Sequence, residues 1–268
     1  MAENLATEKF PVMWRHVVRR NWWVYRKFLL SRFIWNLFAP TVTLLAFGLG
    51  VGSLISANNV TIDGISGFSY LTFITPGLII FTTCFVASGD TTYGSFIRFD
   101  FQKTFDAQVS TPVSVRDLIL GEVLYATFAS EIACLGMLIV AFILGAPLSP
   151  LFIITPIFAL LGALTFACQG ILVTSYSGKI ENFSYYFEGF LIPMQFLSGA
   201  FFSLSLLPAP LRFVAQLVPL TWVINVTRNL FIGVIDPVQI VFTVFYCFLI
   251  SIITFYLAKR KFFKRMML

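Results

Sequence analysis

Residues 98–122 read RFDFQKTFDAQVSTPVSVRDLILGE, and this stretch decides the fold because long apolar runs lie on both sides of it. Between the two ends of the chain, charge is dense only here. A charged stretch between two apolar runs must face water between two membrane spans. We call residues 98–122 the island. Its opposing charges are nearly balanced: Arg98, Lys103 and Arg116 against Asp100, Asp106, Asp117 and Glu122.

The balance of charge indicates what the island binds. A segment that bound only anionic lipid would carry an excess of basic residues. Balanced charge with phenylalanines between the charges suits docking against another protein, and the alternative is a solvated loop between two helices. We therefore predict that residues 94–117 form a cytoplasmic coupling segment that receives force from a soluble partner. The predicted contact residues are Arg98, Asp100, Phe101, Lys103, Thr104, Phe105 and Asp106.

The composition identifies the class of protein. Of the 268 residues, 58% are hydrophobic and 11% are charged, and the mean hydropathy is +0.89. A soluble core of this length does not need so much apolar surface, so we predict a polytopic membrane protein. The apolar runs predict six transmembrane helices within a single transmembrane domain over residues 1–268. The predicted spans are residues 33–55, 71–93, 118–144, 151–176, 183–202 and 237–257.

Two further segments complete the predicted all-α fold. Residues 10–32 place apolar and aromatic side chains on one helical face and arginines on another, which predicts an amphipathic interface helix in the headgroup plane. This helix either anchors the chain or forms a wall of the docking site. Residues 203–236 are apolar but broken by prolines, so they predict two short half-helices that re-enter the outer leaflet. Ser114 and Asp117 fit a capping box that begins the next helix.

The cations orient the chain in the membrane. Placing both ends, the island and the turn at residues 177–182 in the cytoplasm leaves only Arg212 and Arg228 outside. This arrangement follows the positive-inside rule, and the opposite one breaks it. Basic residues run from Lys9 to Arg32 before the first apolar run, so we expect no cleaved signal peptide. Both termini are therefore predicted to be cytoplasmic.

Few residues offer catalytic or metal chemistry. His16 is the only histidine and lies beside arginines, which argues against a metal site and a histidine-based triad. The four cysteines fall inside apolar runs without metal-like spacing, as small buried hydrophobes do. No GxxxxGK[ST] pattern occurs, so we expect no cofactor and no ATP hydrolysis in this chain. We expect no nucleic acid among its partners.

The fifth predicted span carries two stripes at helical spacing. The apolar stripe is Phe183, Phe187, Phe190, Met194, Leu197 and Phe201, and the polar stripe is Glu181, Tyr185, Glu188, Gln195 and Gly199. A carboxylate such as Glu188 within a span costs roughly 2.5–3.5 kcal/mol, so it seldom faces lipid. The polar stripe therefore lines a cargo path or gate, or bonds to a neighbouring helix. The predicted path or gating residues are Tyr185, Phe187, Glu188, Phe190, Met194, Gln195 and Arg228.

Two further charged side chains lie in apolar surroundings. For Glu131, in the predicted span 118–144, we favour a hydrogen bond to a neighbouring helix. Arg228 lies on the predicted outer side. It either snorkels to the outer headgroups or forms an ion pair that holds the re-entrant hairpin shut.

Residues 193–228 read PMQFLSGAFFSLSLLPAPLRFVAQLVPLTWVINVTR and resemble the type-2 ABC exporter permeases. The matching features are Pro193, Phe196-Leu197-Ser198-Gly199, Phe201-Phe202, Leu207-Pro208, Pro219-Leu220-Thr221 and Arg228. The island is similar to the cytoplasmic contact segment of such permeases, although Phe105 stands where many relatives have an acid followed by leucine. The stretches NLFAPTVTLLAFGLGVG and TPGLIIFTTCFVASGDTTYGSF resemble the nodulation-factor permease branch of that family. The resemblance covers nearly the whole chain.

This resemblance implies partners and a cargo. It implies a homodimer with two copies of a separate ATP-binding subunit, which holds ATP and Mg²⁺, in a bacterial inner membrane. The implied cargo is amphipathic, a lipid-linked glycan or lipo-oligosaccharide moved outward across the inner membrane, and drug efflux is the alternative. Membrane lipids are expected as further partners. An ion-coupled secondary transporter would show broken helices in both halves, and only the second half is broken here. An intramembrane enzyme would need a nucleophile with its base, which the sequence lacks.

Overall fold

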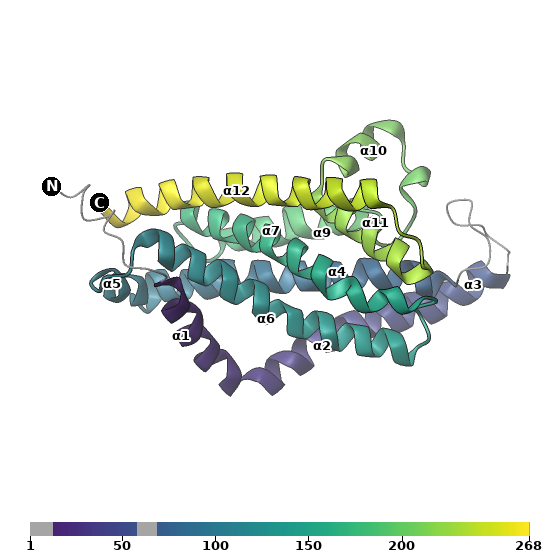
Figure 1. The fold of residues 1–268 in the computed structure, drawn as a ribbon, viewed down its shortest axis with the longest axis horizontal. Coiled ribbons are helices and arrows are strands. Elements are labelled where there is room, and N and C mark those ends of the chain that lie inside the picture. The colour runs from purple at the N-terminus through teal and green to yellow at the C-terminus, as the bar shows by residue number, and fades with distance from the viewer. Residues whose placement is uncertain (1–12, 58–68, 268) are drawn as a thin grey trace.

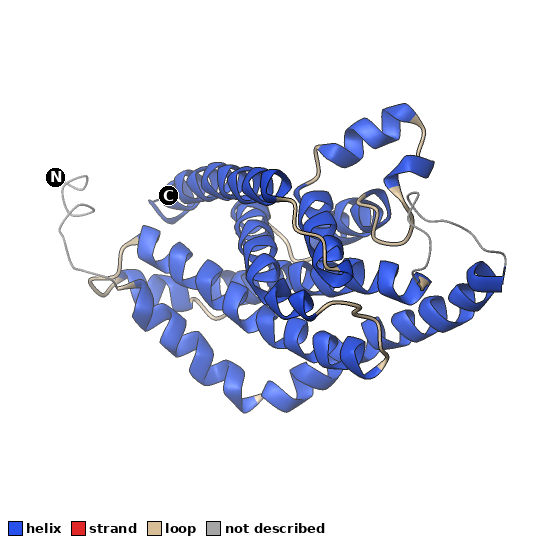
Figure 2. Cartoon of the chain, turned by 45° about the vertical axis from the view of Figure 1, so that its right-hand side comes forward, coloured by secondary structure: helices blue, strands red, loops and turns tan. Residues whose placement is uncertain are grey.

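The computed structural model describes residues 13–57 and 69–267, so the first three residues of the predicted interface helix lie outside the described part. Throughout the described residues the chain forms helices, turns and loops, with no strand (Figure 2). Five helical stretches among these residues are long and apolar enough to cross a membrane: Leu29–Leu54, Tyr70–Phe101, Val115–Ile143, Pro150–Tyr176 and Pro237–Met266. The prediction of an all-α polytopic membrane protein is confirmed.

Three of the five long stretches are built from consecutive helical elements, and two of these, Leu29–Leu54 and Tyr70–Phe101, contain π-helical turns, in which an extra residue enters one turn. The elements in chain order are α1 (Trp14–Lys27), α2 (Leu29–Leu45), η1 (Ala46–Val51), α3 (Gly52–Ala57), α4 (Tyr70–Gly89), η2 (Asp90–Gly94), η3 (Ile97–Phe101), α5 (Thr104–Val109), α6 (Val115–Ile143), η4 (Pro150–Ile154), α7 (Thr155–Tyr176), α8 (Asn182–Tyr186), η5 (Phe187–Leu191), α9 (Ile192–Leu197), η6 (Leu204–Leu206), α10 (Ala209–Gln216), α11 (Pro219–Ile232) and α12 (Pro237–Met267). The central helix is α4, which is buried along most of its length and packs against α6, α7 and α11 (Figure 1).

The predicted interface helix is shorter than expected and bends away from the first span. The backbone leaves helical geometry at Phe28, so α1 and α2 meet at an angle and form a V (Figure 1). Residues 29–32, predicted within the interface helix, instead begin α2. On α1 the buried side chains are Val17, Asn21 and Tyr25, and they face α6. One face of α1 therefore packs against the chain's own bundle, and Arg15, Arg19 and Arg26 remain exposed.

The helix predicted as the fifth span begins where expected and ends early. Its elements α8, η5 and α9 are continuous from Asn182 to Leu197, and this run is shorter than the five long stretches. It ends because Gly199 adopts a left-handed backbone conformation with a φ of 79°, which a side chain would oppose. The glycine of the FLSG sequence is thus the residue that stops the helix.

The region predicted to hold two short helices does hold them. Helices α10 and α11 are joined by a bend of 87°. Pro219 begins α11, where the missing N–H has no intrahelical partner to lose. The Thr221 hydroxyl donates to the Ala215 carbonyl at 2.6 Å, and the Trp222 indole N–H donates to the Gln216 carbonyl at 2.8 Å. The residues of the PLT sequence therefore hold the corner, and α10 projects from the bundle (Figure 1).

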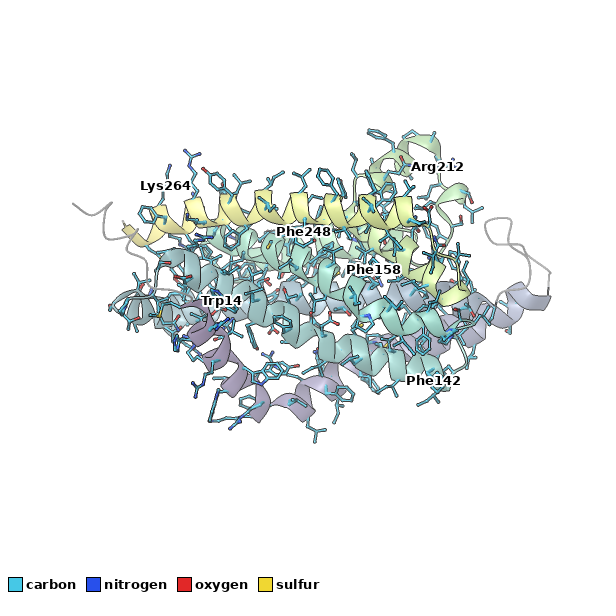
Figure 3. All side chains as sticks on the ribbon, in the orientation of Figure 1. Trp14, Phe142, Phe158, Arg212, Phe248 and Lys264 are labelled. Carbon is cyan, nitrogen blue, oxygen red and sulfur yellow. The ribbon has the colours of Figure 1, made fainter. Side chains whose placement is uncertain are left out.

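The two ends of the bundle differ in composition. Helix α5 and the end of α12 lie at one end, where the Phe105 and Phe262 rings are 6.2 Å apart (Figure 1). Trp14 and Lys264 lie toward this end, whereas Phe142 and Arg212 lie toward the other (Figure 3). We call the first the α5 end. The last turns of α12, rich in lysine and arginine, thus lie beside the island.

Candidate functional site

The island begins as a continuation of the second span. Element η3 extends the α4 stretch to Phe101, and Lys103 then turns the chain with a positive φ of 51°. A short helix, α5, follows. The Ser114 hydroxyl accepts the backbone N–H of Asp117 at 3.1 Å and donates to its carboxylate at 2.7 Å, which starts α6. Ser114 is therefore the N-cap of α6 as predicted, with the Asp117 carboxylate bonded to its hydroxyl.

The predicted contact residues of the island divide into two groups. Phe101 is 64% exposed, and Lys103 and Asp106 are also exposed. Phe105 is fully buried, where it packs edge-on against Phe99 and fixes α5 to the bundle. The exposed group also includes Asp100 and Thr104, which are partly exposed. The island thus presents an aromatic side chain among charges of both signs at the α5 end.

Arg98 does not join that exposed surface. It points inward and forms an ion pair with Glu122, whose side chain is completely buried. The same carboxylate accepts from the Ser95 hydroxyl at 2.9 Å, from the Asn21 amide at 2.8 Å and from Arg20 at 3.4 Å. We call these five residues the Glu122 network. A buried carboxylate with this many donors is fully compensated, and it joins α1, α6 and the end of the α4 stretch.

A second buried carboxylate lies close to the first. Asp90, in η2, accepts from Arg32 of α2 at 2.9 Å. The Arg32 guanidinium also approaches the Tyr125 hydroxyl at 3.4 Å and lies over the Tyr25 ring. Burial raises the pKa of the Tyr25 phenol, which stays neutral and donates to the Ala129 carbonyl. Each arm of the V therefore has its own carboxylate: Glu122 holds α1 and Asp90 holds α2.

The island also contacts α1 directly. The Gln108 side chain on α5 faces Arg20, and its amide oxygen accepts from the guanidinium in the orientation that satisfies both groups. Arg20 in turn contacts Glu122. A continuous polar connection thus runs from the exposed island through α1 to α6.

The sequence places Glu122 in the island but does not indicate its partners. The available signal was the cost of a carboxylate at the start of an apolar helix, which requires a cation nearby. It could not indicate which of the many arginines supplies that charge. Arg20, Asn21 and Arg32 lie in the predicted amphipathic helix and Asp90 lies in the predicted span 71–93, and neither pattern indicates a contact between these elements.

Gly121 lets α1 approach α6 closely beside this network. A Cβ at this position would lie 2.5 Å from the Val17 Cβ and 3.0 Å from the Trp14 carbonyl oxygen. We expect Gly121→Ala to displace α1 and to destabilise the protein by about 1–3 kcal/mol, because overpacking forces the helices apart. The measurement is the rate of thiol labelling at Val17→Cys, a buried position on α1, which should rise in the variant.

Gly89→Ala is the matched control, since nothing lies within 4 Å of a Cβ at that glycine. Labelling at Val17→Cys should be unchanged by this control. Equal labelling rates in both variants would show that α1 is not held against α6 by close packing at Gly121.

The helix Asn182–Leu197 turns its polar stripe away from the chain's own core. Tyr185 and Glu188 are exposed and Gln195 is partly exposed, whereas Phe187 and Met194 are buried. The π-helical turn η5 shifts the register, so Leu191 takes the buried place expected for Phe190. Phe190 is instead exposed. The predicted path residues are therefore split between an exposed face and the core behind it.

Arg228 joins three elements near the end of α9. It donates to the Gly199 carbonyl at 2.6 Å and to the Phe73 carbonyl at 3.3 Å, and it lies over the Phe73 ring. These contacts connect α11, α4 and the turn that follows α9. Arg228 is thus bound within the protein rather than extended toward headgroups.

Glu131 has an incomplete environment. Its Oε1 atom is buried without a hydrogen-bond partner among the described residues, so the predicted bond to a neighbouring helix is not formed at that oxygen. No group of three or more metal-ligating side chains occurs in the part of the chain that the structure describes.

Long apolar helices joined by short turns, with a folded charged segment at one end, define this chain as a multi-pass membrane protein. Residues 13–232 match the family described as ABC-2 type transporter, and the chain belongs to that family. It is accordingly a transmembrane permease of the ABC type, a transport subunit rather than a catalyst.

Similar sequences indicate the branch of the family. The chain is 31% identical over 221 residues to nodulation protein J of Rhizobium meliloti (strain 1021), a match that covers 82% of this chain and 81% of the relative. It is 32% identical over 222 residues to nodulation protein J of Rhizobium leguminosarum bv. viciae, with 82% of each chain covered. It is 27% identical over 230 residues to the inner membrane transport permease YadH of Escherichia coli (strain K12), with 84% and 86% covered. The resemblance to the nodulation-factor permease branch is confirmed.

Proposed function

We propose that this chain is the transmembrane subunit of an ATP-driven exporter in a bacterial inner membrane. Two copies of the chain would work with two copies of a separate ATP-binding subunit, which carries ATP and Mg²⁺. The observation that carries this proposal is the exposed surface of the island, where Phe101 stands among Asp100, Lys103 and Asp106. An exposed phenylalanine inside a rim of mixed charge suits a protein partner better than water or lipid.

The arrangement of the bundle supports a cytoplasmic α5 end. The island, the start of α1 and the basic end of α12 share that end (Figure 1). With this end in the cytoplasm, most cations of the described chain lie on the inner side, as the positive-inside rule requires. Both termini then lie in the cytoplasm, and α10 lies at the outer side.

The exposed polar stripe supports an amphipathic cargo. Tyr185, Glu188 and Gln195 can hydrogen-bond sugar hydroxyls, and the exposed Phe190 on the same helix offers an aromatic face. Phe187 and Met194 support this surface from the core. We propose that the cargo is a lipid-linked glycan or lipo-oligosaccharide moved outward, and the nodulation protein relatives make that class the first to test. Efflux of an apolar drug is the competing assignment.

The docking surface is tested by reversing two of its charges. We expect Asp100→Lys combined with Asp106→Lys to weaken binding of the ATP-binding subunit about tenfold, because reversed charges oppose complementary ones on the partner. The measurement is the amount of ATP-binding protein that copurifies with the chain after gentle solubilisation. The amount of folded chain in the membrane should stay constant, since both carboxylates are at least partly exposed.

Arg15→Glu with Arg19→Glu is the comparison variant, because these exposed arginines lie on α1 at the same end of the bundle. If copurification survives reversal of the island but fails on reversal of α1, the docking site is α1. If no ATP-binding protein copurifies with the unaltered chain, the proposed function is wrong.

A further inference from the structure

Two polar atoms in and beside the Glu122 network lack hydrogen-bond partners among the described residues. They are the Nε atom of Arg98 and the Oδ2 atom of Asp90, and both are buried. Each buried polar group without a partner costs on the order of 1–3 kcal/mol. One of these atoms is a donor and the other an acceptor, so the same contact would satisfy both.

Arg98 already lies against both carboxylate residues. Its Nη2 atom donates to Glu122 Oε2 and approaches the backbone carbonyl of Asp90 at 3.3 Å. The other Asp90 oxygen, Oδ1, is held by Arg32. In the arrangement seen here, Arg98 is therefore bound to the carboxylate that holds α1. The free oxygen belongs to the carboxylate that holds α2.

The backbone between these residues has unusual helical geometry. Asp90 begins the π-helical element η2, and Arg98 lies in the next one, η3. A π-helical turn holds one extra residue, and such turns often mark places where a helix changes register at a functional site. A change of register in this stretch would move the Arg98 side chain relative to both carboxylates.

We propose that Arg98 is a positioning residue that exchanges between Glu122 and Asp90 when the island moves, and that this exchange changes the angle between α1 and α2. In one state Arg98 pairs with Glu122, and Arg32 alone pairs with Asp90. In the other, Arg98 binds the free oxygen of Asp90 and leaves Glu122 to Arg20 and Asn21. The helix breaks at Phe28, between α1 and α2. A change in the ion pairs that fix either helix therefore changes the angle between the two helices at this residue. This inference rests on the proposed function, in which a partner moves the island.

The test measures the opening of the V in the complete complex. Spin labels at Arg19→Cys on α1 and Trp35→Cys on α2 span the hinge, and both positions are exposed. The four native cysteines are buried and do not compete for the label. Labelled chain is diluted into unlabelled chain, so that each complex carries one pair. Pulsed electron resonance then gives the distance distribution without nucleotide and with ATP and vanadate.

We expect two distance populations whose ratio changes at least about fivefold with nucleotide, the lower range of allosteric coupling. Asp90→Asn keeps an acceptor for Arg32 but removes the charge and the second oxygen. It should leave one population that does not respond. Thr92→Val is the matched control, because this buried threonine donates only to carbonyls of its own helix, and it should respond as the unaltered chain does.

A nucleotide response in Asp90→Asn equal to that of the unaltered chain would overturn the exchange. Should Asp90→Asn fail to fold, Arg98→Lys carries the same test, since lysine keeps the charge but has no Nε donor and no fork to span two carboxylates. Failure of the proposed function is recognised separately, because the ATP-binding protein would then not copurify with the unaltered chain.

Discussion

Replacing Glu122 by leucine is expected to destabilise the protein by about 3–5 kcal/mol, the usual cost of removing one partner of a buried ion pair. Arg98 would remain mostly buried without its carboxylate, and the Asn21 amide and Ser95 hydroxyl would lose the same acceptor. The added apolar volume does not offset this loss, because the guanidinium of Arg98 keeps its charge in a mostly buried place. A loss of this size lowers the thermal midpoint by roughly 6–20 °C for a chain of this length.

The measurement is the temperature at which half of the detergent-solubilised protein loses its monodisperse elution. Glu122→Gln keeps the shape and an acceptor, so it should lose less than the leucine variant. Thr127→Val is the matched control on α6, since this buried hydroxyl donates only to the Val123 carbonyl of its own helix. If the leucine variant and the control have the same midpoint temperature, the network adds nothing to stability. Its ion pairs then only offset the cost of their desolvation.

The sequence predicted the membrane-spanning helices well because each is a long apolar run, and local composition is enough to recognise such a run. The start of α6 was equally predictable, since the capping interaction of Ser114 joins residues only three apart. The two short helices at the corner follow from the prolines, which cannot continue a helix. All of these features depend on neighbours in the sequence.

The polar connections between helices could not be predicted in the same way. Arg98 and Glu122 are 24 residues apart, and Asn21 and Glu122 are 101 apart, so no periodic pattern links them. Arg98 was assigned to the docking surface because it lies among charged residues that do face outward. The continuation of the second span into η3 rotates its side chain inward instead. Predicting that inward position requires knowing where the helix ends.

For the helix Asn182–Leu197, the sequence predicts most of the residues on the buried and exposed sides, but not all of them. Spacing alone separated a polar stripe from an apolar one, and the structure turns the two in different directions. The π-helical turn η5 adds a residue and exchanges the places of Phe190 and Leu191. A periodicity of 3.6 residues cannot anticipate that shift, which moves the Phe190 ring from the core to the exposed surface of the chain.

Glu188→Ala combined with Gln195→Ala is expected to reduce cargo transport about a hundredfold, since each lost hydrogen bond is worth about 1.4 kcal/mol, or tenfold. Both side chains point away from the chain's own core, and hydrocarbon would leave them unsatisfied at a cost of roughly 2.5–3.5 kcal/mol for a carboxylate. They must therefore meet water, cargo or a second copy. In a twofold dimer, a helix near the axis presents its stripe once from each copy, which gives an amphipathic cargo two sets of polar groups.

The measurement is transport of a lipid-linked oligosaccharide into proteoliposomes, with ATP hydrolysis in the absence of cargo followed in parallel. Transport should fall while that hydrolysis continues, because the proposed docking surface for the ATP-binding subunit is the island and not this helix. Phe248→Ala, on the exposed face of α12, controls for the loss of any large side chain in the membrane (Figure 3). Loss of assembly in the double variant would assign the stripe to contacts between copies. Normal transport would remove the stripe from the path, and then Glu131, whose Oε1 atom is buried without a partner among the described residues, would become the next residue to test.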